Sequence, residues 1–249
     1  PIGCQMRAHF YKTNISRHNG ALEAVYNLKD WTSSPGHGDY VEGIGVQDVE
    51  RGGLSAIKLA PWQTDTAIGD WFYNQNWKAN DTGTMYRSAR WVIQTLIDVV
   101  SKNGNMLLNV IQRPDGSLDP EVETLLTDVA NWIAVHGEGI YATCPWKVYG
   151  EGETVTEAGH FKEDFGFTAA DIRFTQTKDG STIYAFALGW PESGRLQIRS
   201  LAGHGVESVE ILGHTEKLSF TQTPEGLQVT LPARPTSEIA CGLKIRVSR

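Results

Sequence analysis

Residues 43–74, GIGVQDVERGGLSAIKLAPWQTDTAIGDWFYN, decide the fold of this chain. They contain two short apolar runs, Gly43–Val49 and Trp62–Ile68, and each run gives way to a polar loop that contains glycine. Short apolar runs that end in loops are typical of buried parallel strands. We therefore expect two neighbouring strands of an α/β sheet. Their carboxyl ends should open onto the edge where such sheets usually hold their chemistry.

Acidic and aromatic side chains gather at these two strand ends. Glu50 ends the first strand, Asp48 precedes it by two residues on the same strand face, and Trp71 follows the second strand. An acid beside flat rings suits a sugar site, because the acid protonates the glycosidic oxygen and the rings stack on the pyranose. The plainer alternatives are a solvated loop charge for Glu50 and ordinary loop contacts for Trp71. Asp48 either supports Glu50 or raises its pKa by repulsion, and the sequence leaves both open.

Strands and helices alternate on both sides of this stretch, which is the pattern of a parallel sheet. The expected helices, with apolar residues three and four apart, are Cys4–Arg17, a short helix at Leu54–Leu59, Met85–Lys102 and Pro120–His136. The expected additional strands are Leu22–Leu28 and Asn105–Ile111, and the expected long loops are Asp30–Tyr40 and Asp70–Gly83. Four strands with their helices make half of a (β/α)₈ barrel. Such a half exposes two sheet edges, so we expect it to pair with a missing half or a neighbouring subunit.

The pattern changes after Trp146 to short alternating runs separated by turn residues, which predicts an antiparallel sandwich. The runs are Ile172–Thr177, Thr182–Trp190, Arg195–Leu201, Ser208–Leu212, Leu218–Thr223, Leu227–Leu231 and Gly242–Val247. A connector rich in Gly, Glu and Thr, Cys144–Glu163, precedes them. The predicted fold class is thus α/β plus all-β. Residues 1–145 would form half of a (β/α)₈-like domain, which the family resemblance given below implies is the carboxyl-terminal half of a catalytic domain, and residues 146–249 a β-sandwich.

Composition narrows the classes of function. The chain has 249 residues with 40% hydrophobic and 20% charged content, as in ordinary globular proteins, and a net charge of −7, which disfavours nucleic acid and anionic membrane partners. No apolar run of eighteen residues exists, so we expect no membrane span. Cys4, Cys144 and Cys241 lack C-x-x-C spacing and the histidines are scattered, so we expect no metal site. Three buried thiols are favoured over one disulfide and a free thiol.

Four blocks of the chain resemble one known family. VQDVERG (46–52), PWQTDTAIGDWFYN (61–74), NMLLNV (105–110) with PDGSLDPEVETLL (114–126), and WIAVHGEGIYATCPW (132–146) are similar, in order and spacing, to glycoside hydrolase family 29, the α-L-fucosidases. The resemblance covers roughly the whole chain, more weakly over the last hundred residues. It implies a (β/α)₈-type catalytic barrel followed by a β-sandwich, and the blocks match the second half of the barrel.

The resemblance also implies a reaction. A retaining exo-α-L-fucosidase would use Glu50 as acid/base and place Trp71 near the C5 methyl group of fucose, with no metal and no cofactor. The family's nucleophile is an Asp in a Trp-x-Asp context at the end of the fourth barrel strand. No such motif occurs here, since Asp30-Trp31 has the wrong order. We therefore assign no nucleophile to this chain and expect the first four strands to lie outside it.

The implied partners are a fucosylated oligosaccharide or glycoconjugate and the missing amino-terminal barrel half or a neighbouring subunit, and a homo-oligomer stays open. Two alternatives to an enzyme are kept. One is a non-catalytic carbohydrate-binding protein or a relic of a glycosidase, and the other is a structural fragment that braces a barrel. The sequence assigns neither the fucosyl linkage nor a compartment.

Overall fold

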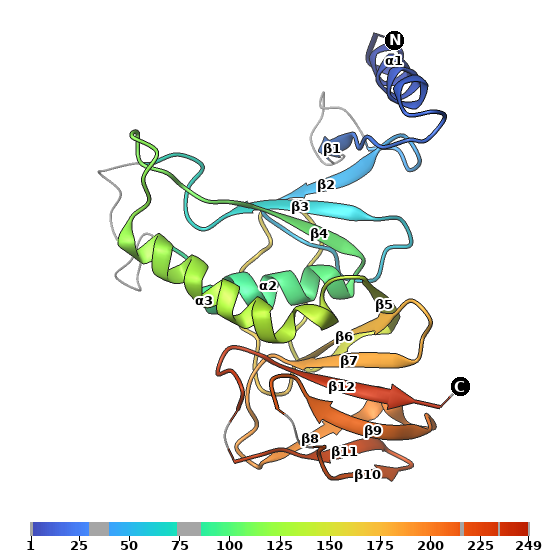
Figure 1. The fold of residues 1–249 in the computed structure, drawn as a ribbon, viewed down its shortest axis with the longest axis vertical. Coiled ribbons are helices and arrows are strands. Elements are labelled where there is room, and N and C mark those ends of the chain that lie inside the picture. Colours follow the sequence, from blue (N-terminus) through green and yellow to red (C-terminus); the bar gives the residue numbers. More distant parts are fainter. Residues whose placement is uncertain (1, 30–39, 74–85, 215–216, 234, 249) are drawn as a thin grey trace.

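A parallel sheet forms the first layer of the molecule (Figure 1). The computed structural model describes residues 2–29, 40–73, 86–214, 217–233 and 235–248. The sheet strands are β1 (Asn27–Lys29), β2 (Val46–Glu50), β3 (Trp62–Ala67) and β4 (Gly104–Asn109), in the order β1-β2-β3-β4, and all pairs are parallel. The alternating pattern of the sequence therefore predicted the sheet correctly, including the two strands of the deciding stretch.

Two helices lie between the parallel sheet and the antiparallel strands below it (Figure 1). They are α2 (Ala89–Ser101) and α3 (Pro120–His136). The fully buried indole of Trp62 on β3 contacts Val99 on one side of α2, while Ile93 and Ile97 contact the antiparallel layer on the other. Because α2 is apolar on two faces, it joins both layers into one body.

The second layer is a sandwich of antiparallel strands. One sheet has the order β5-β6-β7-β12-β9 and the other β10-β11-β8. The strands are β5 (Thr143–Glu151), β6 (Ile172–Thr177), β7 (Thr182–Ala187), β8 (Arg195–Ile198), β9 (Val206–Ile211), β10 (Phe220–Thr223), β11 (Gly226–Thr230) and β12 (Cys241–Val247), with short 3₁₀ turns η1 (Gly137–Gly139) and η2 (Arg199–Leu201). The predicted fold class, α/β followed by an antiparallel sandwich, is confirmed.

Several predicted elements have different bounds. The helix α1 (Ile2–Arg17) begins two residues before the predicted Cys4 and ends at Arg17 as predicted, ahead of Asn19 and Gly20, which take positive φ. The helix expected over Met85–Lys102 begins only at Ala89, because the Ser88 hydroxyl caps it by accepting from the Trp91 N–H. The long loops Asp30–Tyr40 and Asp70–Gly83 lie largely outside the described residues.

Three other expectations fail for identifiable reasons. Leu54–Leu59 is irregular rather than helical, because a helix of about one and a half turns forms too few hydrogen bonds to offset the cost of nucleation. The strand expected over Leu22–Leu28 is confined to Asn27–Lys29, the residues that β2 can pair with. The first part of the expected connector is strand β5, which pairs with β6. The division between residues 145 and 146 stays a prediction.

A buried ion cluster connects α2 to the sandwich. Asp98 binds Lys102 Nζ at 2.6 Å and Arg173 Nε at 2.6 Å, and Lys102 also donates to the Thr156 hydroxyl at 2.7 Å. The Lys102 side chain is fully buried, and burial lowers its pKa. Since Arg173 lies on β6, this cluster joins the helix layer to the antiparallel sheet.

The three cysteines are free thiols, but only Cys241 is buried; Cys4 is exposed and Cys144 half-buried, so the expectation of three buried thiols is wrong. Within the part of the chain that the structure describes, no helix has the length and apolar content needed to cross a bilayer.

Candidate active site

Three carboxylates surround one ammonium group at the carboxyl ends of β1, β2 and β3. Lys29 Nζ forms an ion pair with Asp65 and lies 3.4 Å from Asp48 Oδ2 and 3.9 Å from Glu50 Oε2. The strand register explains this arrangement, since Lys29 is level with Asp48 and Glu50 is level with Asp65. Side chains two residues apart on a strand share a face. The structure therefore brings Asp48 and Glu50 together, as expected, and adds Lys29 and Asp65.

The electrostatics of this cluster differ from residue to residue. Burial raises the pKa of Asp48, the negative charge of Asp65 raises it further, and Lys29 opposes both effects. The Glu50 side chain is 19% exposed against 10% for Asp48, so Glu50 has the freer access to solvent. Of the two carboxyl groups on β2, Glu50 is thus the better placed to meet a substrate. Asp48 is more buried and pairs with Lys29.

The backbone of Glu50 is fixed by a distant segment. Its N–H donates to His160 Nδ1 at 2.8 Å, and its carbonyl oxygen accepts from the Phe161 N–H at 2.9 Å. A few residues along, the Gly159 N–H donates to the Gly53 carbonyl at 3.0 Å. The segment that follows β5 therefore runs beside the Glu50 loop and leaves the Glu50 carboxyl group out of these bonds.

A buried carboxylate, Glu163, anchors the same segment. It accepts from Thr66 Oγ1 at 2.6 Å, from Arg51 at 2.9 Å and from Arg87 Nη2 at 3.2 Å. Its side chain is only 6% exposed. We call Arg51, Thr66, Arg87 and Glu163 the Glu163 cluster. Sequence reasoning missed it because a Glu-rich connector is typical of solvated chain; a buried acid there shows only once the fold is known.

Trp71 lies at the carboxyl end of β3, beside a cavity of about 350 Å³. The indole is half-buried, its backbone N–H donates to Asp70 Oδ1, and its carbonyl accepts from Asn109 Nδ2. Phe72 and Tyr73 line the same cavity. Trp71 thus shares the strand-end edge with Glu50, in a cavity between the ends of β3 and β4.

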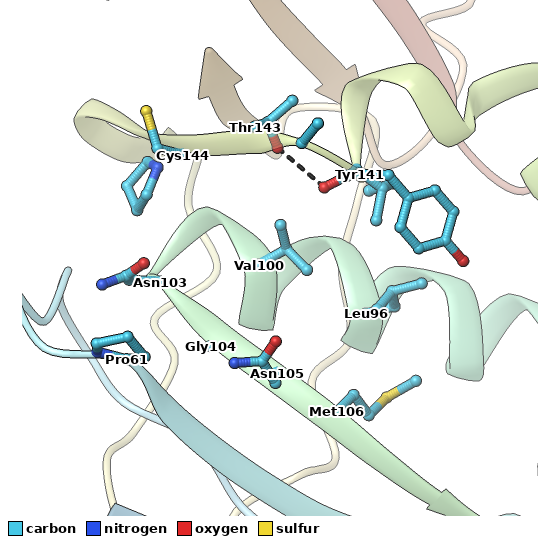
Figure 2. A pocket seen from close by; sticks show the side chains of 13 residues that line it. Pro61, Leu96, Val100, Asn103, Gly104, Asn105, Met106, Tyr141, Thr143 and Cys144 are labelled. Atoms are coloured by element: carbon cyan, nitrogen blue, oxygen red, sulfur yellow. Dashed lines mark hydrogen bonds between the residues drawn. The ribbon is translucent and has the colours of Figure 1, made fainter. Parts of the chain in front are cut away.

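A second cavity, of about 450 Å³, lies at the other end of the strands (Figure 2). It opens between the start of β4, with Asn103 and Asn105, and the start of β5, with Tyr141 just before the strand and Cys144 in it. None of the predicted site residues lines it. Although it is the larger cavity, the amino-terminal edge of a parallel sheet is rarely where chemistry is done.

The strand-end edge therefore offers an acid with a fixed backbone, a cation that neutralises neighbouring carboxylates and an aromatic cavity nearby. This set suits the recognition and protonation of a sugar. Among the described residues no group of three or more His, Cys, Asp or Glu side chains is arranged to hold a metal ion.

Comparison of the sequence with protein families gives two matches. The family described as "Alpha-L-fucosidase" matches residues 10–138, and the "Alpha-L-fucosidase C-terminal domain" matches residues 166–246. The tissue α-L-fucosidase of Homo sapiens is 29% identical over 181 residues, which cover 72% of this chain and 34% of that protein. The chain spans about a third of the length of the curated relatives it matches.

Solved structures show the same fold. An α-L-fucosynthase of Thermotoga maritima is 24% identical with a TM-score of 0.70, covering 98% of this chain and 48% of that chain. A family 29 α-L-fucosidase of Bacteroides thetaiotaomicron, described as a trapped covalent intermediate, is 20% identical with a TM-score of 0.63, covering 82% of this chain and 43% of that one. These likenesses identify the layers as a partial barrel followed by the carboxyl-terminal β domain.

Proposed function

The chain belongs to the α-L-fucosidase family, and we propose on that basis that it forms the carboxyl-terminal part of a retaining exo-α-L-fucosidase, a glycoside hydrolase. The observation that carries the proposal is the placement of Glu50. Its carboxyl group stands at the end of β2 on the polar face of the sheet, while its backbone is bonded on both sides to the segment 159–161. A group held in this way meets its substrate in one orientation.

Glu50 would act twice in the reaction. It first protonates the glycosidic oxygen while a nucleophilic carboxylate bonds to the anomeric carbon of fucose and the aglycone leaves. It then takes a proton from water, which attacks the fucosyl–enzyme intermediate and releases fucose with retained configuration. The intermediate trapped in the Bacteroides thetaiotaomicron relative supports this two-step course.

The other predicted residues would support this reaction. The Trp71 ring would lie against the C5 methyl group of fucose, because an aromatic face binds apolar carbon better than a hydroxyl group. Asp48 would hold the Lys29 ammonium group in place. Because Lys29 also lies within reach of Glu50, its positive charge would stay next to the acid that faces the sugar.

The nucleophile would come from a segment outside this sequence, either the amino-terminal barrel half or a neighbouring subunit. The two carboxyl groups of a retaining enzyme stand about 5–5.5 Å apart, so that segment must dock against the polar face of β1 and β2. The substrate would be a fucosylated oligosaccharide or glycoconjugate.

The test is turnover of an aryl α-L-fucoside by the purified 249-residue chain, with denaturing mass analysis to exclude a second polypeptide. We expect no turnover from the chain alone and turnover when an amino-terminal barrel half is supplied. Turnover by the chain alone would mean that the nucleophile belongs to this sequence, in the same copy or in an identical neighbour, and would contradict a nucleophile from outside it. Fucose binding without turnover in either form would favour the carbohydrate-binding alternative.

A further inference from the structure

The Glu163 cluster joins three segments that end at the proposed active site. Arg51 follows Glu50 directly, Thr66 follows Asp65 directly, and Arg87 donates its backbone N–H to the Ile68 carbonyl just beyond β3. Glu163 binds the side chains of all three residues. One buried carboxylate from the segment after β5 therefore binds side chains at the ends of both β2 and β3.

The Glu50 loop has an unusual backbone that needs such an anchor. Arg51 takes φ of +46°, in the left-handed region that residues with a side chain rarely adopt. The Arg51 guanidinium reaches Glu163 through both Nε and Nη2 at 2.9 Å, which fixes the side chain as well as its charge. These two contacts to one carboxylate oxygen offset the strain at Arg51, the residue that directly follows Glu50.

Burial makes the cluster stiff. The Glu163 carboxylate is almost fully buried, so the loss of a partner would leave a buried charge unpaired, which is costly. Removing the carboxylate therefore releases the Arg51 and Thr66 side chains from this cluster, while Arg87 keeps its ion pair with Asp164.

We infer that Glu163 is a positioning residue, which acts through Arg51 and the segment 159–161 to hold the Glu50 carboxyl group where it delivers its proton. This inference rests on the proposed function, since it assigns Glu163 a role in general acid catalysis by Glu50. Glu163 itself does not contact the sugar.

The first arm of the test does not depend on activity. Hydrogen exchange is followed at the Glu50 and Phe161 amides in the full chain, in wild type and in Glu163→Ala. We expect at least tenfold faster exchange at both amides in Glu163→Ala, with unchanged exchange in β7, which shows that the sandwich stays folded. The control is Glu157→Ala, which removes an exposed acid of the same segment that pairs with the surface residue Lys162. Unchanged exchange at Glu50 in Glu163→Ala would overturn the inference.

The second arm measures turnover in whichever assembly is active with wild-type chain. Displacing an acid by about 1 Å costs roughly 100-fold, and the loss matters only when the leaving group needs the proton. We expect Glu163→Ala to lower kcat/KM about 100-fold on a fucosyl oligosaccharide and much less on an aryl fucoside with an acidic phenol. Glu163→Gln keeps an acceptor oxygen for Thr66 and should recover part of the loss.

The two failures are distinguishable. Equal losses on both substrates would mean that Glu163 only stabilises the fold, and would overturn the positioning role. Failure of the proposed function would instead show as Glu50→Ala matching wild type on the oligosaccharide, whatever Glu163→Ala does to exchange at the Glu50 amide. Faster exchange with that result would remove the catalytic role and leave a purely structural anchor.

Discussion

Glu50 and His160 are 110 residues apart in the sequence, yet the Glu50 backbone N–H donates a 2.8 Å hydrogen bond to His160 Nδ1. The bond uses the main chain of Glu50 and leaves its carboxyl group facing Lys29. The position of Glu50, at the end of a strand of the parallel sheet, thus depends on the segment 159–161, which leads into the sandwich.

Replacement of Glu50 tests the assignment directly. We expect Glu50→Ala to lower turnover of fucosyl oligosaccharides by about 10²- to 10⁴-fold, because general acid–base catalysis contributes that much, and to affect activated aryl fucosides less. Steady-state kinetics on both substrates measure the difference. Wild-type rates on the oligosaccharide would remove Glu50 from the mechanism.

A glycine at position 52 is required by the close approach of two segments of the chain. A Cβ at Gly52 would lie 1.9 Å from the Gly159 carbonyl oxygen, whereas a Cβ at Gly53 would meet nothing within 4 Å. We expect Gly52→Ala to lower the free energy of unfolding by about 1–3 kcal/mol, as overpacking does, and to separate the Glu50 loop from residue 159. Gly53→Ala is the matched control and should change stability little. Urea unfolding compares the two variants, and equal midpoints would contradict so close an approach at Gly52.

The buried ion cluster of Asp98, Lys102 and Arg173 should be costly to break. Asp98→Ala leaves two buried cations without their shared carboxylate, so we expect a loss of about 3–5 kcal/mol in the free energy of unfolding. Asp128→Ala, an exposed position on α3, is the control and should stay within about 0.5 kcal/mol of wild type. Chemical denaturation compares the two, and similar values would show that the cluster contributes no net stability.

Acid should weaken the protein through His136. Its side chain is buried against Trp132, ring centroids 4.7 Å apart, and burial lowers its pKa from the usual 6.5. The unfolded chain therefore binds the proton more readily than the folded one, and stability falls as the pH drops below 6.5 toward the folded pKa. We expect His136→Gln to flatten this part of the stability curve.

The control for this effect is His214→Gln, since His214 is exposed and its replacement should leave the pH dependence as in wild type. Thermal unfolding between about pH 7.5 and pH 5 gives the slopes. An unchanged slope in His136→Gln would assign the acid sensitivity to other groups.

Local patterns predict the regular elements and fail where contacts are remote. The bounds of α3 and β6 match those expected from the sequence. In α3 the apolar periodicity follows one buried face, and β6 is a short run that ends just before the turn residues Asp179 and Gly180. The sequence pattern instead assigns β5 to a connector, since its pairing with β6 is decided by the partner strand and not by its own residues.

The same limit applies to the candidate site. Glu50 and Asp48 can be found from the sequence because they share one strand. Lys29 joins them only through the parallel register of β1, and Glu163 only through a return of the chain about a hundred positions later. Neither residue carries a local signal, because a lysine after an apolar run and a glutamate in a polar connector are ordinary surface residues.

The bonds between segment 159–161 and the Glu50 loop also bear on inheritance and engineering. A recombination event or a designed chimera that exchanges everything after residue 146 would import a foreign partner for Glu50, even though it leaves each strand of the parallel sheet untouched. Sandwiches from related proteins should therefore be interchangeable only when the connector that comes with them has a histidine and a glutamate at the positions of His160 and Glu163. The Glu50 loop and the connector segment bonded to it therefore have to be exchanged together.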